Sequence, residues 1–342
     1  MERITYPYLA GSLARGGVHR RHVLQGGLAA LAAWAALPAA AQEKAPARRN
    51  LLVALGASGA TSGAVGQAVC NLINAGNRKD FACKSHVTTG SAANVTALTR
   101  RADELAFAQT DTAWAAVNGK GEWNGKPAGA LRVILPMFFE PISLVVRQDA
   151  RIKTMADLKG KRIAVGVTGS EARTNALDIL SWYGFQPDRD LQVMPLELGQ
   201  ALGKMVTREI DGFFHVGAHP SEAIARIVIS APIALVPIDG PQADAALKQQ
   251  TYYVAGSLPG RLYRGVADQP VKTVGVHALL MTHDGLPPEI CYELTKLLVE
   301  QWDTLRAANG AMQPFRPAEI AGQKIAPYHP GAMRYLRERK FL

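Results

Sequence analysis

The stretch VTTGSAANVTALTRRADELAFAQTDTAWAAVN, residues 87–118, decides the fold because it holds two strand ends, each followed by a helix. A β-branched run ends at Gly90, and Ser91 can accept hydrogen bonds from the free N–H groups of the helix that follows. A second apolar run, 105–108, stops at the polar residues 109–111, which can cap another helix. Polar groups therefore collect at the carboxyl ends of strands, where an open α/β sheet binds its ligand.

The composition indicates a globular protein with two domains. The chain has 342 residues, 48% hydrophobic content and a mean hydropathy of zero, which excludes the membrane-spanning and disordered classes. The net charge is +10 at pH 7. A basic protein can attract an acidic solute, an anionic membrane surface or nucleic acid. Because the basic residues are scattered without an aromatic-interleaved patch, we expect no nucleic-acid partner.

Residues 1–41 are expected to be an export signal that is cleaved near Ala41. Arg20-Arg21 precedes an uncharged run that ends in Ala39-Ala40-Ala41, which is typical of a signal peptide of the twin-arginine type. The run is shorter than the roughly 20 residues of a membrane-spanning helix. An uncleaved N-terminal anchor is the alternative. We therefore expect a periplasmic protein.

The chain has three cysteines, an odd number for an exported protein. Cys70 lies in the first expected helix and Cys83 at the start of the next strand, so a short loop separates them. We expect a disulfide between them in an oxidising compartment, and two buried thiols are the alternative. Cys291 is expected to be a lone core residue.

A glycine-rich turn at 56–66 follows the first apolar strand, 51–55, and precedes a helix. Strand, glycine-rich turn and helix also form a dinucleotide site, so an exported NAD(P)-dependent oxidoreductase is the alternative function. The spacing, however, is G-x-x-G-x-x-x-G, and no acidic residue ends the next strand. No paired nucleophile and base and no G-x-S-x-G motif is present, so we expect no enzyme activity and no cofactor.

The second half of the chain repeats this pattern. The loop 167–171 contains Thr168-Gly169-Ser170 and opens a helix, as Thr89-Gly90-Ser91 does in the first half. Each loop predicts an anion-binding nest at a helix start. His215 and His219 are four residues apart, but Gly217 and Pro220 argue against one continuous helix, so we expect no metal site.

The order T-G-S-x-x-N and then A-x-x-Q-x-D, in residues 89–111, resembles the solute-binding subunits of tripartite ATP-independent periplasmic (TRAP) transporters of the TAXI family. The flanking segments 56–74, 140–166, 213–224 and 327–338 support the resemblance in the same order. It implies an α/β fold of two lobes, the type II-like periplasmic-binding-protein fold, with the ligand cleft between them. Its boundaries are expected to be 42–142 and 266–342 for the first lobe and 143–265 for the second.

The resemblance implies a monomer that captures a small carboxylate-bearing solute, an amino acid or a dicarboxylate, and delivers it to the membrane subunit of a TRAP transporter. Backbone N–H groups of the two nests would hold the carboxylate, while Gln109 and Asp111 could bind an amino or amide group. Each contact residue has a local alternative, because such side chains also cap helices without any ligand. The expected ligand-binding residues are Ser58, Thr61, Thr89, Gly90, Ser91, Asn94, Gln109, Asp111, Thr168, Gly169, Ser170, Glu171, Phe214, Ala218 and His219.

The chain departs from the family in its glycine-rich turn. Many family members carry the aromatic pair of V-Y-Y-P there, whereas this chain reads Gly63-Ala64-Val65-Gly66. The aromatic surface on which a solute could stack is therefore missing from this turn. The known family solutes, glutamate, glutamine and oxoglutarate, are not carried over to this chain.

Overall fold

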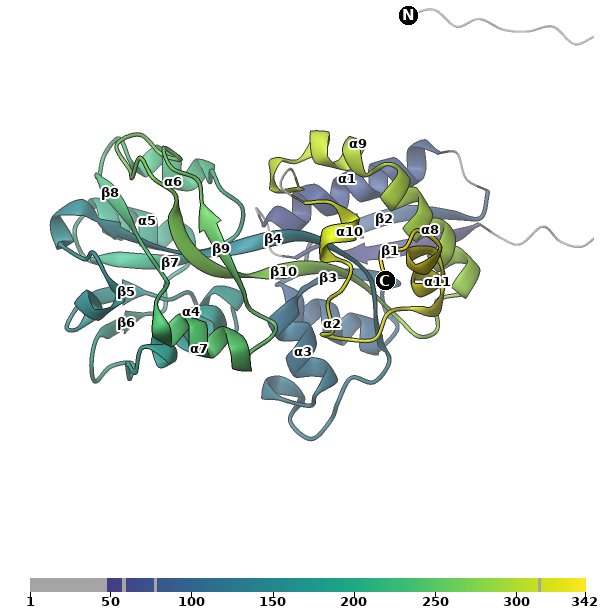
Figure 1. Ribbon diagram of the computed structural model, residues 1–342, viewed down its shortest axis with the longest axis horizontal. Coiled ribbons are helices and arrows are strands. Elements are labelled where there is room, and N and C mark those ends of the chain that lie inside the picture. The colour runs from purple at the N-terminus through teal and green to yellow at the C-terminus, as the bar shows by residue number, and fades with distance from the viewer. Residues whose placement is uncertain (1–47, 57–59, 77–78, 313–314) are drawn as a thin grey trace, which may run out of the picture. The chain divides into compact units, whose positions relative to one another are not determined.

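The computed structural model describes residues 48–342 apart from 57–59, 77–78 and 313–314. The predicted export signal and Ser58 lie outside the described residues. Ten strands form one mixed sheet in the order β2-β1-β3-β10-β4-β7-β5-β6, with β8 paired to β4 and β9 paired to β10. The chain runs through this sheet as two halves that share β4 and β10 (Figure 1).

The first lobe holds the parallel strands β1, β2 and β3. Three helices alternate with these strands, and the chain's last helices return to the same lobe. In chain order its elements are β1 (Arg49–Ala54), α1 (Thr61–Ala75), β2 (Phe81–His86), α2 (Ser91–Thr99), β3 (Leu105–Gln109), α3 (Thr110–Val117), η1 (Gly121–Trp123), α8 (Pro288–Glu300), α9 (Trp302–Ala308), η4 (Gly310–Met312), α10 (Pro317–Ile320) and α11 (Pro330–Glu338).

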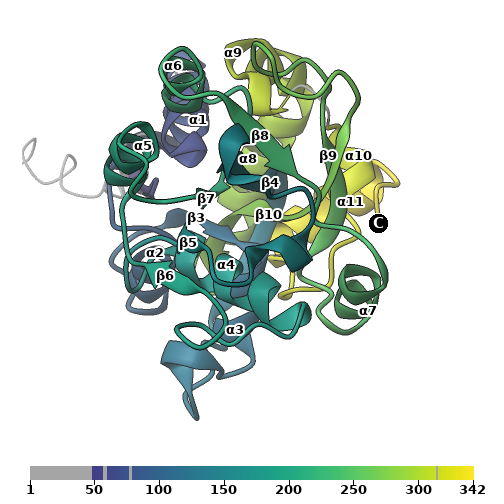
Figure 2. The same cartoon turned by 90° about the vertical axis from the view of Figure 1, so that its left-hand side faces the viewer.

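The second lobe is built around β7, which pairs with β4 on one side and with β5 on the other. In chain order its elements are η2 (Gln148–Ala150), η3 (Met155–Leu158), β5 (Arg162–Ala164), α4 (Glu171–Trp182), β6 (Gln192–Met194), α5 (Leu198–Val206), β7 (Gly212–Val216), α6 (Glu222–Ile227), β8 (Ile233–Val236), α7 (Pro241–Gln249) and β9 (Val254–Leu258). Figure 2 shows this lobe from its end, with α5, α6 and α7 around the strands.

Two long antiparallel strands, β4 (Leu131–Arg147) and β10 (Val271–His283), run through both lobes. Their side chains belong to the cores of both: Leu135 and Leu280 pack in the first lobe, whereas Leu144 and Val276 pack in the second. The sequence predicts two separate runs in 131–146 because prolines interrupt it. The structure keeps one strand, since the pairing with β10 shifts register at Ala278/Leu279, opposite Pro136, where the missing proline N–H is tolerated.

Three other expectations change in detail. Prolines and glycines in 252–263 predict a connector there, but the segment contains strand β9, which pairs antiparallel with β10. The expected single helix 288–309 is divided at Gln301 into α8 and α9. The predicted caps of the first two cleft helices are wrong: Gly90 and Gln109 occupy the cap positions of α2 and α3, and neither helix has a side-chain cap.

The cysteine predictions are confirmed. Cys70 of α1 and Cys83 of β2 form a disulfide, and Asn74 adds hydrogen bonds to the backbone N–H and C=O of Cys83, each of 2.9 Å. Cys291 is free and fully buried in the core of the first lobe. Among the described residues, no helix is long and apolar enough to cross a membrane.

Candidate functional site

Two cavities lie where the first lobe faces α4 of the second. The inner chamber, about 60 Å³, lies at the ends of β1 and β3 and the starts of α1 and α2. The outer pocket, about 290 Å³, lies against α2, α3, η1 and α4. Ser91 and Glu171 line both cavities, so they form the wall between them. Polar residues from both lobes thus surround one divided cleft.

The first predicted nest holds a carboxylate that belongs to the protein itself. The backbone N–H of Ser91, at the start of α2, donates to Glu171 Oε1 at 2.6 Å, although the two residues are 80 positions apart. Gly90 has a φ of +131°, and a Cβ there would lie 3.3 Å from the same oxygen. The dipole of α2 also favours a negative charge at this point. Glu171 therefore occupies the position that the sequence assigns to the solute's carboxylate.

The second predicted nest is a local helix cap. Ser170 Oγ accepts from the backbone N–H of Arg173 at 3.2 Å and donates to the carbonyl of Val167 at 2.8 Å. Thr168 is exposed, and Gly169 lines the outer pocket. The predicted symmetry between the loops is therefore limited to their sequences: one loop receives a side chain from the other lobe, and the second caps its own helix.

Three further hydrogen bonds join the lobes. Thr110 Oγ1 of α3 donates to the carbonyl oxygen of Tyr252, between α7 and β9, at 2.7 Å, and two others cross the cleft. Asn175 of α4 donates to Asp111 Oδ2 of α3 at 2.7 Å. The backbone N–H of Ala218, after β7, donates to Thr61 Oγ1 of α1 at 3.2 Å. Together with the contact of Glu171, they place the described lobes in a closed arrangement, because each bond requires the two lobes to meet.

A buried carboxyl group, that of Glu140 on β4, lies beside the inner chamber. Gln109 Nε2 at the end of β3 donates to Glu140 Oε2 at 2.7 Å. Burial and, to a smaller extent, the nearby charge of Glu171 raise the pKa of Glu140 from 4.5 to about 8, although the hydrogen bond from Gln109 acts to lower it. The Glu140 carboxyl group is therefore largely protonated at pH 7 in this arrangement.

A second acidic cluster lies around Asp111, beside the outer pocket. Burial raises the pKa of Asp111 to about 7, and the carboxylates of Glu171 and Asp178 add to the increase. Tyr253 donates its hydroxyl proton to Asp178 Oδ2 at 2.9 Å and accepts from Asn175 at 3.1 Å. Five acidic residues, from both lobes, therefore line the two cavities: Asp111, Glu122, Glu140, Glu171 and Asp178.

Two buried acceptor atoms of this region have no hydrogen-bond partner. They are Gln109 Oε1, which belongs to the lining of the inner chamber, and Asn175 Oδ1, between Asp111 and Tyr253. Gln109 is 3% exposed and Asn175 is fully buried. Buried polar atoms are rarely left unpaired in a folded protein. Gln109 Oε1 therefore marks a place for a donor group in the inner chamber.

Several predicted contact residues have structural roles. Asn94 donates to the carbonyl of Phe107 at 2.7 Å and accepts from Thr88 Oγ1 at 2.6 Å, so it ties α2 to the sheet. Ser91 Oγ accepts from the backbone N–H of Gln109 at 2.9 Å. Asn94 and Ser91 still line the inner chamber with Thr61, while Thr89 and Gly90 line the outer pocket.

The residues predicted after β7 are only partly brought to the cleft. Phe214 is buried in the core of the second lobe, because its strand alternates side chains between two packed faces, so the structure does not support it as a solute contact. Ala218 contributes the backbone N–H that contacts Thr61. Ala218 and His219 line a separate cavity of about 610 Å³ beside β9 and β10.

His219 belongs to a hydrogen-bonded chain. Its Nδ1 lies 2.6 Å from the hydroxyl of Tyr263, which accepts from the N–H of Ser221, and its Nε2 lies 3.0 Å from Ser143 Oγ. Burial lowers the pKa of His219 to about 3, so the ring is neutral at pH 7. Within the part of the chain that the structure describes, no group of three or more His, Cys, Asp or Glu could hold a metal ion.

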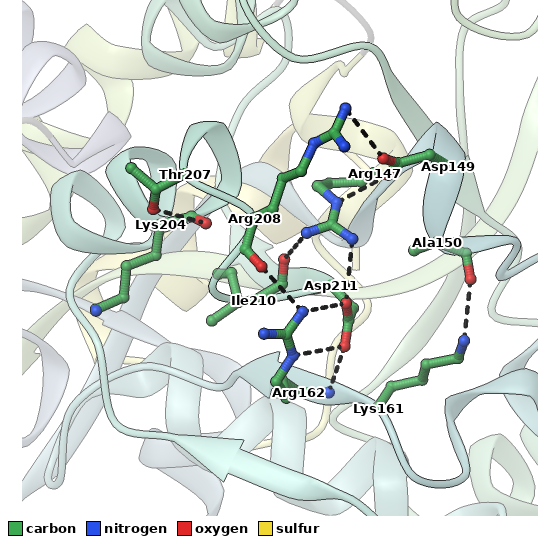
Figure 3. Close-up of polar contacts among 10 residues, drawn as sticks. All are labelled: Arg147, Asp149, Ala150, Lys161, Arg162, Lys204, Thr207, Arg208, Ile210 and Asp211. Atoms are coloured by element: carbon green, nitrogen blue, oxygen red, sulfur yellow. Dashed lines mark hydrogen bonds and ion pairs between the residues drawn. The ribbon is translucent and has the colours of Figure 1, made fainter.

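Basic side chains form a separate cluster at the far edge of the second lobe, where they are already paired (Figure 3). Asp211 accepts from Arg162 Nη2 at 2.8 Å and from Arg147 Nη2 at 3.3 Å, and Arg208 pairs with Asp149 at 3.6 Å. These contacts join β4, β5 and β7. In the lining of the outer pocket, Lys120 is the basic residue.

Glu140, Asn175, Asp178 and Tyr253 were missed by the sequence analysis. Glu140 had a usable signal, because it is the one charged residue in the apolar run 133–146 and ionisable side chains are rarely buried without a function. Asn175 and Asp178 are ordinary polar positions in a helix pattern. Their place in the cleft depends on how the lobes meet, which local spacing does not encode.

Two α/β lobes joined by β4 and β10, with a polar cleft between them, define the two-lobed periplasmic-binding-protein fold. Residues 53–339 match the NMT1-like family, which covers most of the chain, and the chain therefore belongs to this family. Membership of the TAXI family remains a prediction, because the match does not extend to it.

The chain is also similar to solved structures of low sequence identity. The periplasmic aliphatic sulphonate binding protein SsuA from Escherichia coli is 14% identical over 85% of this chain and 79% of that chain, with a TM-score of 0.45. XAC2383 from Xanthomonas citri bound to ATP is 14% identical over 84% and 94%, with a TM-score of 0.47. The sugar acid binding protein DctPAm from Advenella mimigardefordensis in complex with galactonate is 11% identical over 86% and 85%, with a TM-score of 0.44.

Proposed function

We propose that this protein is an extracytoplasmic solute-binding protein, which takes a small solute between its lobes and delivers it to a membrane transporter. The observation that supports this most directly is the divided cleft, whose wall is made by Ser91 of one lobe and Glu171 of the other. A ligand held there would contact both lobes at once. Membership of the NMT1-like family and the two-lobed fold agree with a binding function.

The finer parts of the proposal come from the TAXI resemblance. They are a periplasmic location after cleavage near Ala41, a TRAP-type membrane subunit as partner and a carboxylate-bearing solute. For such a solute to bind in the first nest, its carboxylate would have to replace Glu171 on the N–H of Ser91. Uptake of the identified solute into membrane vesicles, driven by an ion gradient in the absence of ATP, would support the TRAP partner. Uptake that requires ATP would overturn it.

Closure on a solute is the measurable property of a binding protein of this kind. Thermal unfolding of chain 42–342 should be screened against amino acids, dicarboxylates, sulfonates, amines and nicotinamide cofactors. A ligand at a hundred times its dissociation constant stabilises the folded state by about 2.7 kcal/mol. Small-angle scattering should then show compaction with the stabilising solute. Stabilisation by nicotinamide cofactors alone would favour the oxidoreductase alternative, and no stabilisation by any class would contradict the proposal.

A further inference from the structure

Carboxyl and amide oxygens from both lobes gather in the cleft. Glu140, Glu171 and Gln109 line the inner chamber with carboxyl and amide oxygens, and Asp111 and Asp178 continue this surface in the outer pocket. Burial is the largest cause of the raised pKa of Glu140 and of Asp111, and the charges that act on both groups are those of other carboxylates. The cleft is thus suited to a group that brings both positive charge and N–H donors.

An independent observation points to the same kind of ligand. Gln109 Oε1 is buried in the lining of the inner chamber and has no donor, because the amide's nitrogen is held by Glu140. The nearby Asn94 uses its amide group on Thr88, Phe107 and Ala54, so it does not satisfy this oxygen. An ammonium group carries three donors and no acceptor, and can satisfy an amide oxygen and two carboxylates together.

We infer that the cleft binds a small organic cation by its primary ammonium group, which enters the inner chamber between Gln109, Glu140 and Glu171. This inference rests on the proposed binding function and specifies its ligand class. The chamber, of about 60 Å³, holds the ammonium group and the first atoms of the chain behind it. Glu171 separates the chamber from the outer pocket, so its carboxylate must turn to admit the solute and then pairs with the ammonium.

The outer pocket is suited to the body of this solute. Trp114, Trp123 and Tyr252 contribute to its lining, and the rings of Trp114 and Tyr252 are 4.9 Å apart between centroids. Aromatic faces next to carboxylates attract the partly positive methylenes adjacent to an ammonium group. An anionic solute would instead meet Glu171, Asp111 and Asp178 on the way in, with Lys120 as the basic residue of the same lining. The structure thus favours a cation over the carboxylate-bearing solute implied by the family resemblance.

The test compares ligands of one size and different charge. n-Butylamine, 1,4-diaminobutane, butanol and butyrate are titrated into chain 42–342 at neutral pH by calorimetry. We expect binding of the amines, with stoichiometry of one, and no binding of butanol or butyrate. Because Glu140 is largely protonated in the free protein and must ionise beside the ammonium, the binding enthalpy should change with the ionisation enthalpy of the buffer.

Variants locate the site. Glu140→Gln keeps the shape of the side chain and removes its ability to ionise beside the ammonium group, and it should weaken the affinity for n-butylamine by about ten- to a hundredfold. Glu171→Gln should also weaken the affinity. Because Glu171 is only partly buried, this variant should disturb folding less than Glu140→Gln. The matched control Glu222→Gln, at an exposed position of α6, should bind like the wild type.

Four results would overturn the inference. Binding of butyrate without the amines, or equal binding of both, would show that positive charge is not selected, while the binding function itself would stand. No binding of any probe would also reject the inference, and the wider screen would then decide on the binding function separately. Unchanged amine affinity in both Glu140→Gln and Glu171→Gln would exclude this chamber.

Discussion

Glu140 and Asp111 are acidic side chains that folding moves out of water and close to other carboxylates. Their folded-state pKa values, about 8 and about 7, lie above the ordinary values of 4.5 and 3.8. At pH values between the ordinary and the folded-state pKa, the folded protein therefore keeps protons on Glu140 and Asp111 that the unfolded chain has released. Their contribution to the free energy of unfolding is fully present below the ordinary pKa values and is lost as pH rises through the folded-state values.

The pH dependence of stability should therefore change in Glu140→Gln. In the wild type, the free energy of unfolding should fall by up to about 1.4 kcal/mol per pH unit from this group between about pH 5 and about pH 8. The variant should lack this part of the slope. Urea unfolding at several pH values measures it, with Glu222→Gln as the control for an exposed glutamate. Equal slopes for Glu140→Gln and the wild type would contradict the assignment.

At this scale, the sequence predicts local contacts better than distant ones. Ser170 was expected at a helix start, and its cap bond spans three residues. The partner of Ser91 is Glu171, 80 residues away. No local spacing indicates that pair, because it forms only when α2 and α4 approach across the cleft. The sequence thus predicts the anion-binding nest at Ser91, but it does not predict that Glu171 binds there.

Among the elements, α8 and α11 approach closely at Gly331. A Cβ on Gly331 would lie 2.1 Å from the carbonyl oxygen of Pro288 and 2.8 Å from the N–H nitrogen of Tyr292. Gly331→Ala must therefore separate the helices and should destabilise the fold by roughly 1–3 kcal/mol or more. Gly203→Ala, in α5 with no atom within 4 Å of the new Cβ, is the control and should stabilise by about 0.5–1 kcal/mol. Thermal unfolding compares the stabilities of the two variants. Equal effects of Gly331→Ala and Gly203→Ala would contradict the close approach of α8 and α11 at Gly331.

The disulfide between Cys70 and Cys83 links α1 to β2 and closes a loop with a sequence separation of 13. In the chain-entropy model such a loop contributes about 3 kcal/mol, mostly by restricting the unfolded chain. Reduction, or the pair of substitutions Cys70→Ser and Cys83→Ser, should lower the melting temperature, while the double variant should be insensitive to reductant. Cys291 should remain unalkylated in the folded protein because it is buried. Equal melting temperatures with and without reductant would contradict the bridge.

The elements themselves followed closely from hydrophobic periodicity, since strands such as β3 and helices such as α4 are decided by local pattern. The continuity of β4 did not follow, because two prolines in the run indicate a break. Pairing with β10 over most of its length outweighs that local preference. Strand β9 was missed for the same reason: Gly256 within it and Pro259 directly after it indicate a connector, whereas pairing with β10 stabilises an edge strand there.

For the whole molecule, the lobes are joined by β4 and β10 and meet a second time at the cleft. Both strands continue from one core into the other, so a bend within them would separate the cleft surfaces without unfolding either lobe. The polar contacts of Glu171, Asn175 and Ala218 across the cleft oppose that opening. The free protein should therefore be more closed than a binding protein that lacks such contacts.

Glu171→Gln tests this balance, because it keeps the side chain's size and removes the charge that interacts with the start of α2. A hydrogen bond to a charged group contributes about 1.5–3 kcal/mol, so its weakening should shift the closed-to-open ratio by roughly ten- to a hundredfold. Small-angle scattering of the free variant should give a larger radius of gyration than the wild type, and the amide of Ser91 should exchange faster with solvent. Glu197→Gln is the matched control, since Glu197 caps its own helix, α5, within the second lobe. If Glu171→Gln and Glu197→Gln scatter alike and Ser91 stays protected, the Glu171 contact does not hold the lobes together, and closure must depend on the other contacts between the lobes, those of Thr110, Asn175 and Ala218.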